Sequence, residues 1–217
     1  MPNNNMDILR RSAQPVSIEP QKGIIEGYPI VFNQRTLIAG LFYEEIDPHA
    51  LDEADLSDVK FMVNHDDMMI PVARHRRGKR STMDLDVDEK GLHSVARLDV
   101  ERNVDASKLC SAVERGDIED MSFAFGITVG GEEWLDLDKP IPLRRITKIS
   151  RVREISAVND GAYPQTEIYA RSASLENEKK ALADARAVAL ENEKRAKQFQ
   201  LEKQKFLFTE EMKNHDH

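Results

Sequence analysis

The sequence predicts a mainly β, α+β domain followed by a long helical tail. Short segments rich in Ile, Val, Tyr and Phe, separated by Gly, Pro and Asp turns, continue to about Arg171 and are typical of strands. One amphipathic helix interrupts them, and near Ala173 a Glu-, Lys- and Ala-rich stretch without Gly or Pro begins. We therefore divide the chain into a flexible N-terminal segment (1–21), a β domain (22–173) and a charged helical tail (174–217).

The composition of the 217-residue chain argues against several classes of protein. Its formal net charge of −8 does not favour nucleic acid as the main ligand, because phosphate binding needs a basic surface. The single cysteine, Cys110, cannot form an intrachain disulfide, which favours a reducing compartment. No apolar run approaches the about 20 residues that span a bilayer, and the first residues lack the apolar core of a signal peptide. We expect a cytoplasmic protein that binds neither membrane nor nucleic acid.

Strands are expected in order along the β domain. The segment GIIEGYPIVFN is the first, and GLFYEEIDPHALDEADLSD adds a strand, a turn and a short acidic helix or loop. In VKFMVNH, alternation places Phe61, Val63 and His65 on one face, with His65 at the end of the strand. Several short strands follow, interrupted by a basic loop from His75 to Arg80 that is expected to be a solvated hairpin tip.

The stretch NVDASKLCSAVERGD predicts the amphipathic helix of the domain. Asp105 is the expected N-cap, because its side chain can accept a hydrogen bond from a free backbone N–H. Leu109 and Val113 lie inward at positions i and i+4, and Gly116 ends the helix.

The strand from Met121 to about Val129 has two contrasting sides. Alternation puts aromatic and aliphatic residues on one side and small residues on the other. The first side holds Phe123, Phe125 and Ile127, and the second holds Ser122, Ala124, Gly126 and Thr128. We expect the aromatic side to join the core and the small side to leave room for a ligand.

A later strand, RVREISAV, places a carboxylate among apolar residues. Glu154 shares its expected face with Val152, Ser156 and Val158. A buried carboxylate without a partner is costly, so a cationic or donating group should meet it. After this strand we expect a glycine-containing turn and a closing, proline-flanked segment.

A serine, a histidine and an acid from three strands can supply a nucleophile, a base and an orienting group. The serine hydroxyl attacks efficiently only if an imidazole takes its proton, and the imidazole needs an acceptor at its other nitrogen. A structural interpretation stays open from the residues alone, because Ser122 and His65 can be ordinary strand ends. Glu154 can also pair with Arg151 or Arg153. The G-x-S-x-G signature is absent from the sequence.

The sequence predicts neither a cofactor nor a metal site. The histidines of the β domain lack the spacing of metal ligands, and a single cysteine adds no pair. These histidines are His49, His65, His75 and His93.

The tail has high helix propensity and charge pairs at i+3 and i+4. Its leucines hold no single heptad register, so a long coiled coil is not expected. They are Leu175, Leu182, Leu190 and Leu201. A solvated helix and a docking or packaging tail both remain open.

Three segments together resemble the tailed-phage prohead proteases, the capsid-maturation serine peptidases whose fold is shared with the herpesvirus assembly proteases. The segments are FMVNHD, AVERGDIEDMSFAFGI and VREISAVNDGAYPQT, in the family's order. The most specific of them is the helix that ends in Gly-Asp and is followed by Met-Ser-Phe-x-Phe. The resemblance runs from about Lys22 to Arg171. It implies a closed antiparallel β-barrel ringed by a few helices, with peptide-bond hydrolysis as the activity.

The resemblance also implies roles for individual residues. By motif, His65 matches the general base and Ser122 the nucleophile. Glu154 is the best match for the third member, with Asp66 and His93 as rivals, because a second histidine holds this place in the herpesvirus relatives.

The herpesvirus relatives also use an arginine segment near the oxyanion site, soon after the third catalytic residue. Here that region reads NDGAYPQT and contains no arginine. The backbone N–H groups of Gly161 and Ala162 are therefore the expected oxyanion donors.

The implied function is a serine endopeptidase that acts during prohead maturation, inside the assembling prohead in the host cytoplasm. Its implied substrates are the major capsid protein, through its scaffold segment, and the protease itself. A homodimer is expected, the portal is a further candidate partner, and the tail is expected to help package the protease and to be removed by autocleavage. The basic loop is a candidate grip for acidic scaffold segments. The alternatives are a catalytically silent scaffolding or assembly protein on the same fold and a non-viral binding module with a helical tail.

Overall fold

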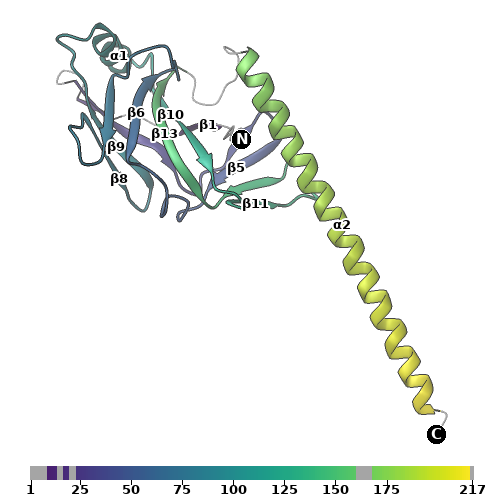
Figure 1. The fold of residues 1–217 in the computed structure, drawn as a ribbon. Coiled ribbons are helices and arrows are strands. Elements are labelled where there is room, and N and C mark those ends of the chain that lie inside the picture. The colour runs from purple at the N-terminus through teal and green to yellow at the C-terminus, as the bar shows by residue number, and fades with distance from the viewer. Residues whose placement is uncertain (1–8, 14–16, 20–22, 160–167, 216–217) are drawn as a thin grey trace, which may run out of the picture.

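The structure is a computed structural model that describes residues 9–13, 17–19, 23–159 and 168–215 (Figure 1). Its strands form a body, and its two helices lie on opposite sides of them (Figure 1). The architecture is mainly β with two helices, in agreement with the predicted α+β class. Neither helix in the described ranges is long and apolar enough to cross a membrane.

In the described part of the chain the strands pair into three sheets. The first has the order β1 (Leu9–Ala13), β10 (Asp120–Ile127), β13 (Ile149–Val158), β6 (Asp58–Val63) and β7 (Ala73–Arg76). The second has the order β2 (Ser17–Glu19), β3 (Ile24–Val31), β9 (Gly91–Arg97) and β8 (Met83–Val87). The third has the order β11 (Glu132–Leu135), β12 (Leu143–Ile146), β5 (Phe42–Ile46) and β4 (Thr36–Ile38).

The predicted closed antiparallel barrel differs from this arrangement in two respects. Two strand pairs are parallel, β13 with β6 and β12 with β5, so the first and third sheets are mixed, whereas the second is antiparallel throughout. No sheet formed by the described residues closes on itself, and closure into a barrel stays a prediction.

Residues 9–13 and 17–19 take part in the sheets, although the sequence predicts a loose segment there. The β1 strand pairs antiparallel with β10, with Ser12 opposite Ser122, and β2 pairs antiparallel with β3. Backbone pairing along an existing strand edge explains how so polar a segment becomes a strand. The division of the chain into three parts stays a prediction.

The hydrophobic core contains the aromatic side of β10, as the sequence predicts. Phe123 and Phe125 are 2% and 0% exposed, and their rings stack with centroids 5.0 Å apart. Residues of all three sheets and of α1 (Val104–Glu114) join the same core. Burying these side chains holds β10 in place from one side and leaves its other side for polar groups.

The N-cap of α1 is Asn103, and the prediction of Asp105 is wrong. The Asn103 side chain accepts hydrogen bonds from the backbone N–H groups of Asp105 and Ala106, at 3.0 and 3.3 Å. Asp105 lies in the first turn, where its charge favours the positive end of the helix dipole. Gly116 follows the helix with a φ of 74°, which confirms the predicted stop.

The tail is one helix, α2 (Ile168–His215), which starts before the predicted boundary and runs beside the body before it projects away (Figure 1). Near its beginning, Glu178 and Leu182 are buried. The Arg186 guanidinium donates to the carbonyl oxygens of Lys139 and Pro140, at 3.2 and 3.4 Å. From Leu190 to Lys205 every side chain is exposed, so this stretch of α2 is not packed against the body.

Candidate active site

Three polar side chains from different segments meet at the first sheet. The His65 Nε2 atom lies 2.6 Å from Ser122 Oγ, and the His65 Nδ1 atom lies 2.5 Å from Glu154 Oε1. Ser122 belongs to β10, Glu154 to β13, and His65 follows the end of β6. The imidazole is therefore hydrogen-bonded to a hydroxyl on one nitrogen and to a carboxylate on the other.

A tight turn after β6 places the imidazole. Asn64 and His65 have φ values of 52° and 58°, a left-handed conformation that is uncommon for residues other than glycine. The Asn64 N–H donates to the Ala157 carbonyl at 2.9 Å, and the Asn64 side-chain oxygen accepts from the Asn159 N–H at 3.1 Å. These bonds tie the turn to β13. Because β13 lies between β6 and β10, the His65 ring must cross β13 to reach Ser122.

A register shift in β13 sets which residues share the face of Ser122. Ser156 pairs with Ser122 and Glu154 with Ala124, but the next pair is Val152 with Phe125, so Arg153 is passed over. Such a bulge reverses the alternation of a strand. Val152 is therefore part of the core, and the prediction that it shares the face of Glu154 is wrong.

The site is more enclosed than the sequence predicts. Ser122 and Ala124 are 4% and 1% exposed, although the small residues on this side predict an open surface. The Glu154 side chain is 6% exposed and the His65 side chain 12%. A buried carboxylate needs a cationic or donating partner, and the His65 ring fills that place.

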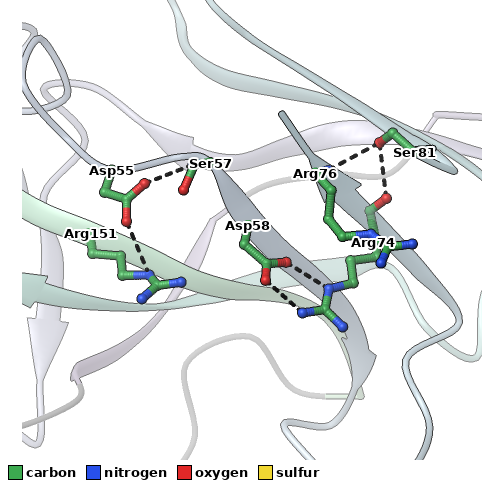
Figure 2. Close-up of polar contacts among 7 residues, drawn as sticks. All are labelled: Asp55, Ser57, Asp58, Arg74, Arg76, Ser81 and Arg151. Carbon is green, nitrogen blue, oxygen red and sulfur yellow. Dashed lines mark hydrogen bonds and ion pairs between the residues drawn. The ribbon is translucent and has the colours of Figure 1, made fainter. Parts of the chain in front are cut away.

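The alternative partners of Glu154 lie elsewhere. Arg151 faces Asp55, with 3.5 Å between Nε and Oδ2 (Figure 2). Arg153 is exposed, at the position that the register shift passes over. The ion pair of Glu154 that the structure describes is with His65.

Neither rival for the third position has a hydrogen bond to the His65 ring in the described part of the chain. The Asp66 carboxylate accepts a hydrogen bond from the Met68 N–H at 2.9 Å, within the turn. His93 lies in β9, and its Nε2 is 2.7 Å from Glu26 Oε1. Gly161 and Ala162, the expected oxyanion donors, lie outside the described residues.

The edge of β10 that does not pair with β13 is already occupied in this structure. An extended peptide can add to a free strand edge, but β1 occupies this one and pairs with all of residues 121–125. A substrate must therefore displace β1 or approach over the face of the sheet.

The basic segment is partly neutralised by neighbouring carboxylates. Arg74 lies in β7, and its Nε and Nη2 atoms each donate to the Asp58 carboxylate at 2.6 Å (Figure 2). Arg77, Lys79 and Arg80 are exposed around Gly78, whose φ is 72°. These three residues form a solvated tip, as the sequence predicts, but His75 and Arg76, which the prediction included in the tip, lie half-buried in β7. Among the described residues, no group of His, Cys, Asp and Glu side chains could hold a metal ion.

Comparison with known proteins supports the resemblance found in the sequence. A family model described as caudovirus prohead serine protease matches residues 11–181. The solved structure of the bacteriophage T4 capsid assembly protease is similar at 13% identity, over 74% of this chain and 100% of that chain, with a TM-score of 0.42. A likeness this distant carries no argument about the site. No curated protein sequence matches the chain.

Proposed function

The chain belongs to the caudovirus prohead serine protease family, and on that premise we propose that His65, Ser122 and Glu154 are its catalytic triad. The observation that carries the proposal is the hydrogen-bonded position of the His65 ring between Ser122 Oγ and Glu154 Oε1. Ser-His-acid peptidases use this arrangement, with the base between the nucleophile and the acid that orients it.

In the proposed mechanism, His65 Nε2 accepts the Ser122 proton as Oγ attacks the scissile carbonyl carbon. Glu154 holds the other ring nitrogen and stabilises the imidazolium that forms. His65 then protonates the leaving amine, and water resolves the acyl-enzyme with His65 again as the base. Backbone N–H groups of Gly161 and Ala162 are the proposed oxyanion donors, from the sequence pattern alone.

The proposed substrates are phage structural proteins inside an assembling prohead in the host cytoplasm: the scaffold segment of the major capsid protein and the protease itself. Family membership supports this substrate class. The portal is a further proposed partner, and the proposed active form is a homodimer. The exposed part of α2 is the segment proposed to contact scaffold or capsid helices.

A catalytically silent assembly protein on the same fold is the competing function. It needs no buried hydrogen-bonded chain of serine, histidine and glutamate, and burying such a chain costs desolvation of each polar group. The retention of all three side chains in contact therefore favours the peptidase.

A serine-directed fluorophosphonate tests the proposal on the full chain. We expect labelling at Ser122, located by peptide mass spectrometry, and its loss in Ser122→Ala and His65→Ala. Intact masses of the same proteins report self-processing. Two matched controls are available: Ser94→Ala, a buried serine of β9, and His93→Ala, a histidine that also pairs with a glutamate. Labelling that persists in Ser122→Ala, or that falls equally in the controls, would overturn the triad.

A further inference from the structure

A second serine lies directly opposite the proposed nucleophile. Ser156 on β13 is the antiparallel register partner of Ser122, and its neighbour on the other side is Met62 of β6. Residues opposite one another in an antiparallel pair project to the same face, with Cβ atoms about 4.5–5.5 Å apart. The Ser156 hydroxyl therefore lies beside Ser122, on the strand that the His65 ring crosses.

The Ser156 hydroxyl is buried without a hydrogen bond. The residue is 0% exposed, and its Oγ has no hydrogen-bond partner in the part of the chain that the structure describes. An unsatisfied buried hydroxyl lowers stability, and alanine fills nearly the same space without that cost. By contrast, the buried Ser94 donates to the Gly27 carbonyl at 3.1 Å. The Ser156 hydroxyl thus destabilises the fold, which calls for a functional explanation.

We propose that Ser156 is a further catalytic residue, whose hydroxyl donates a hydrogen bond to Ser122 Oγ while that oxygen carries negative charge. The inference rests on the proposed function of Ser122. A hydrogen bond to a charged oxygen is stronger than one to a neutral hydroxyl, so its contribution is specific to the reaction. Stronger interaction in the transition state than in the resting enzyme is what accelerates a step.

The bond changes place Ser156 in both halves of the reaction. In acylation, the Ser122 proton moves to His65 Nε2 while the Oγ electron pair forms the new C–O bond and the carbonyl π pair moves to the carbonyl oxygen. That pair then re-forms the carbonyl, the bond between the carbon and the leaving group breaks, and the leaving group takes the proton from His65, which is left neutral. In deacylation, water gives its proton to His65 and attacks, the carbon–Oγ bond breaks, and the electron pair returns to Oγ, which regains a proton from His65. Ser156 keeps its own proton throughout and donates only a hydrogen bond.

The test uses p-nitrophenyl acetate and the full chain, with the burst rate reporting acylation and the steady-state rate reporting deacylation. We expect Ser156→Ala to lower both rates roughly 10- to 100-fold with little change in KM. A matched pair of variants isolates the hydroxyl, because threonine and valine have the same shape. Both rates should be higher in Ser156→Thr than in Ser156→Val, by a similar factor. If both of these variants unfold, the rates of the wild type and of Ser156→Ala alone test the inference.

Thermal unfolding separates catalysis from structure. Ser156→Ala should keep or raise the Tm, because it removes an unsatisfied group, whereas the control Ser94→Ala should lower the Tm and leave both rates unchanged. Wild-type rates in Ser156→Ala, or a greater loss of Tm than in Ser94→Ala, overturn this inference alone when Ser122→Ala is inactive. Turnover by Ser122→Ala at the wild-type rate, or a wild type inert to both the ester and the fluorophosphonate, overturns the proposed function instead.

Discussion

The imidazole of His65 and the hydroxyl of Ser122 lie 2.6 Å apart, although β13 separates the strands that carry them. The contact depends on the turn after β6, whose bonds to β13 direct the ring across that strand. Glu154 comes from the strand being crossed and is 2.5 Å from the same ring. Small movements of this turn relative to β13 should therefore affect catalysis before they affect the core.

Glu154→Gln should lower the ester turnover of the full chain by about 1,000- to 10,000-fold, because the amide cannot stabilise the imidazolium or fix its tautomer. The matched control is Glu26→Gln, which alters a second, partly buried Glu–His pair. In that pair Glu26 Oε1 lies 2.7 Å from His93 Nε2. Burst and steady-state rates with p-nitrophenyl acetate provide the measurement. A loss of similar size in both variants would show that the effect comes from general damage to the fold.

Asp58→Asn should reduce stability at neutral pH but not in acid. The Arg74 guanidinium holds the pKa of the Asp58 carboxyl below its usual value, so the ion pair stabilises the fold fully above the unfolded pKa of about 3.9. This contribution is lost as the pH falls through the lower folded pKa. Both side chains are about a third exposed, so we expect at most about 1 kcal/mol at pH 7, measured by urea unfolding. A difference that grows at lower pH would contradict this assignment.

Leu182→Ala should lower the free energy of unfolding by about 2 kcal/mol, because Leu182 is 8% exposed where α2 meets the body. Leu190→Ala is the matched control on the same helix. Leu190 is 53% exposed, so we expect a change within about 0.5 kcal/mol. Equal effects of the two substitutions would mean that α2 is not attached to the body at Leu182.

Deletion of residues 191–217 should leave the Tm and the fluorophosphonate labelling of Ser122 unchanged, because described side chains from Leu190 to Lys205 are all exposed. Incorporation of the protease into proheads should fall, as measured by its copy number in purified particles. A drop in labelling would show that the tail supports the active site, and unchanged incorporation would contradict the proposed packaging role.

Cys110 should react slowly with thiol reagents in the native protein. Burial in α1 raises the pKa of its thiol, which reduces the fraction of reactive thiolate at mildly alkaline pH. Absorbance with Ellman's reagent should show a rate that rises sharply after denaturation. The same rate in native and denatured protein would place the thiol at the surface.

Local patterns in the sequence predict the parts of the fold that depend on neighbouring residues. Alternation alone separates Phe123 and Phe125 from Ser122, because the side-chain period of a strand is two. It does not predict that His65 meets both Ser122 and Glu154, since these contacts join residues 57 and 89 positions apart and depend on the order of strands in the sheet. The resemblance to the family, which the family model confirms, supplied that step. The relation to herpesvirus proteases stays a prediction.

The errors of the prediction have physical causes. Asn103 and Asp105 are both good capping residues two positions apart, and only the backbone conformation decides between them. The bulge at Arg153 reverses an alternation that otherwise looks regular, so alternation predicts the wrong face for Val152. Asn64 is the residue in the sequence that indicates the left-handed turn, because asparagine tolerates positive φ.

The strand β1 occupies the edge of β10 beside Ser122 and therefore competes with any peptide that would pair there. A peptide that adds to the sheet there must displace β1 and replace its backbone hydrogen bonds with β10 by its own. Since both sets of bonds are backbone hydrogen bonds to β10, exchanging one for the other is nearly neutral in energy. The side chains of the peptide then decide whether it replaces β1. Residues 9–13 would then restrict this edge to peptides whose side chains fit it well.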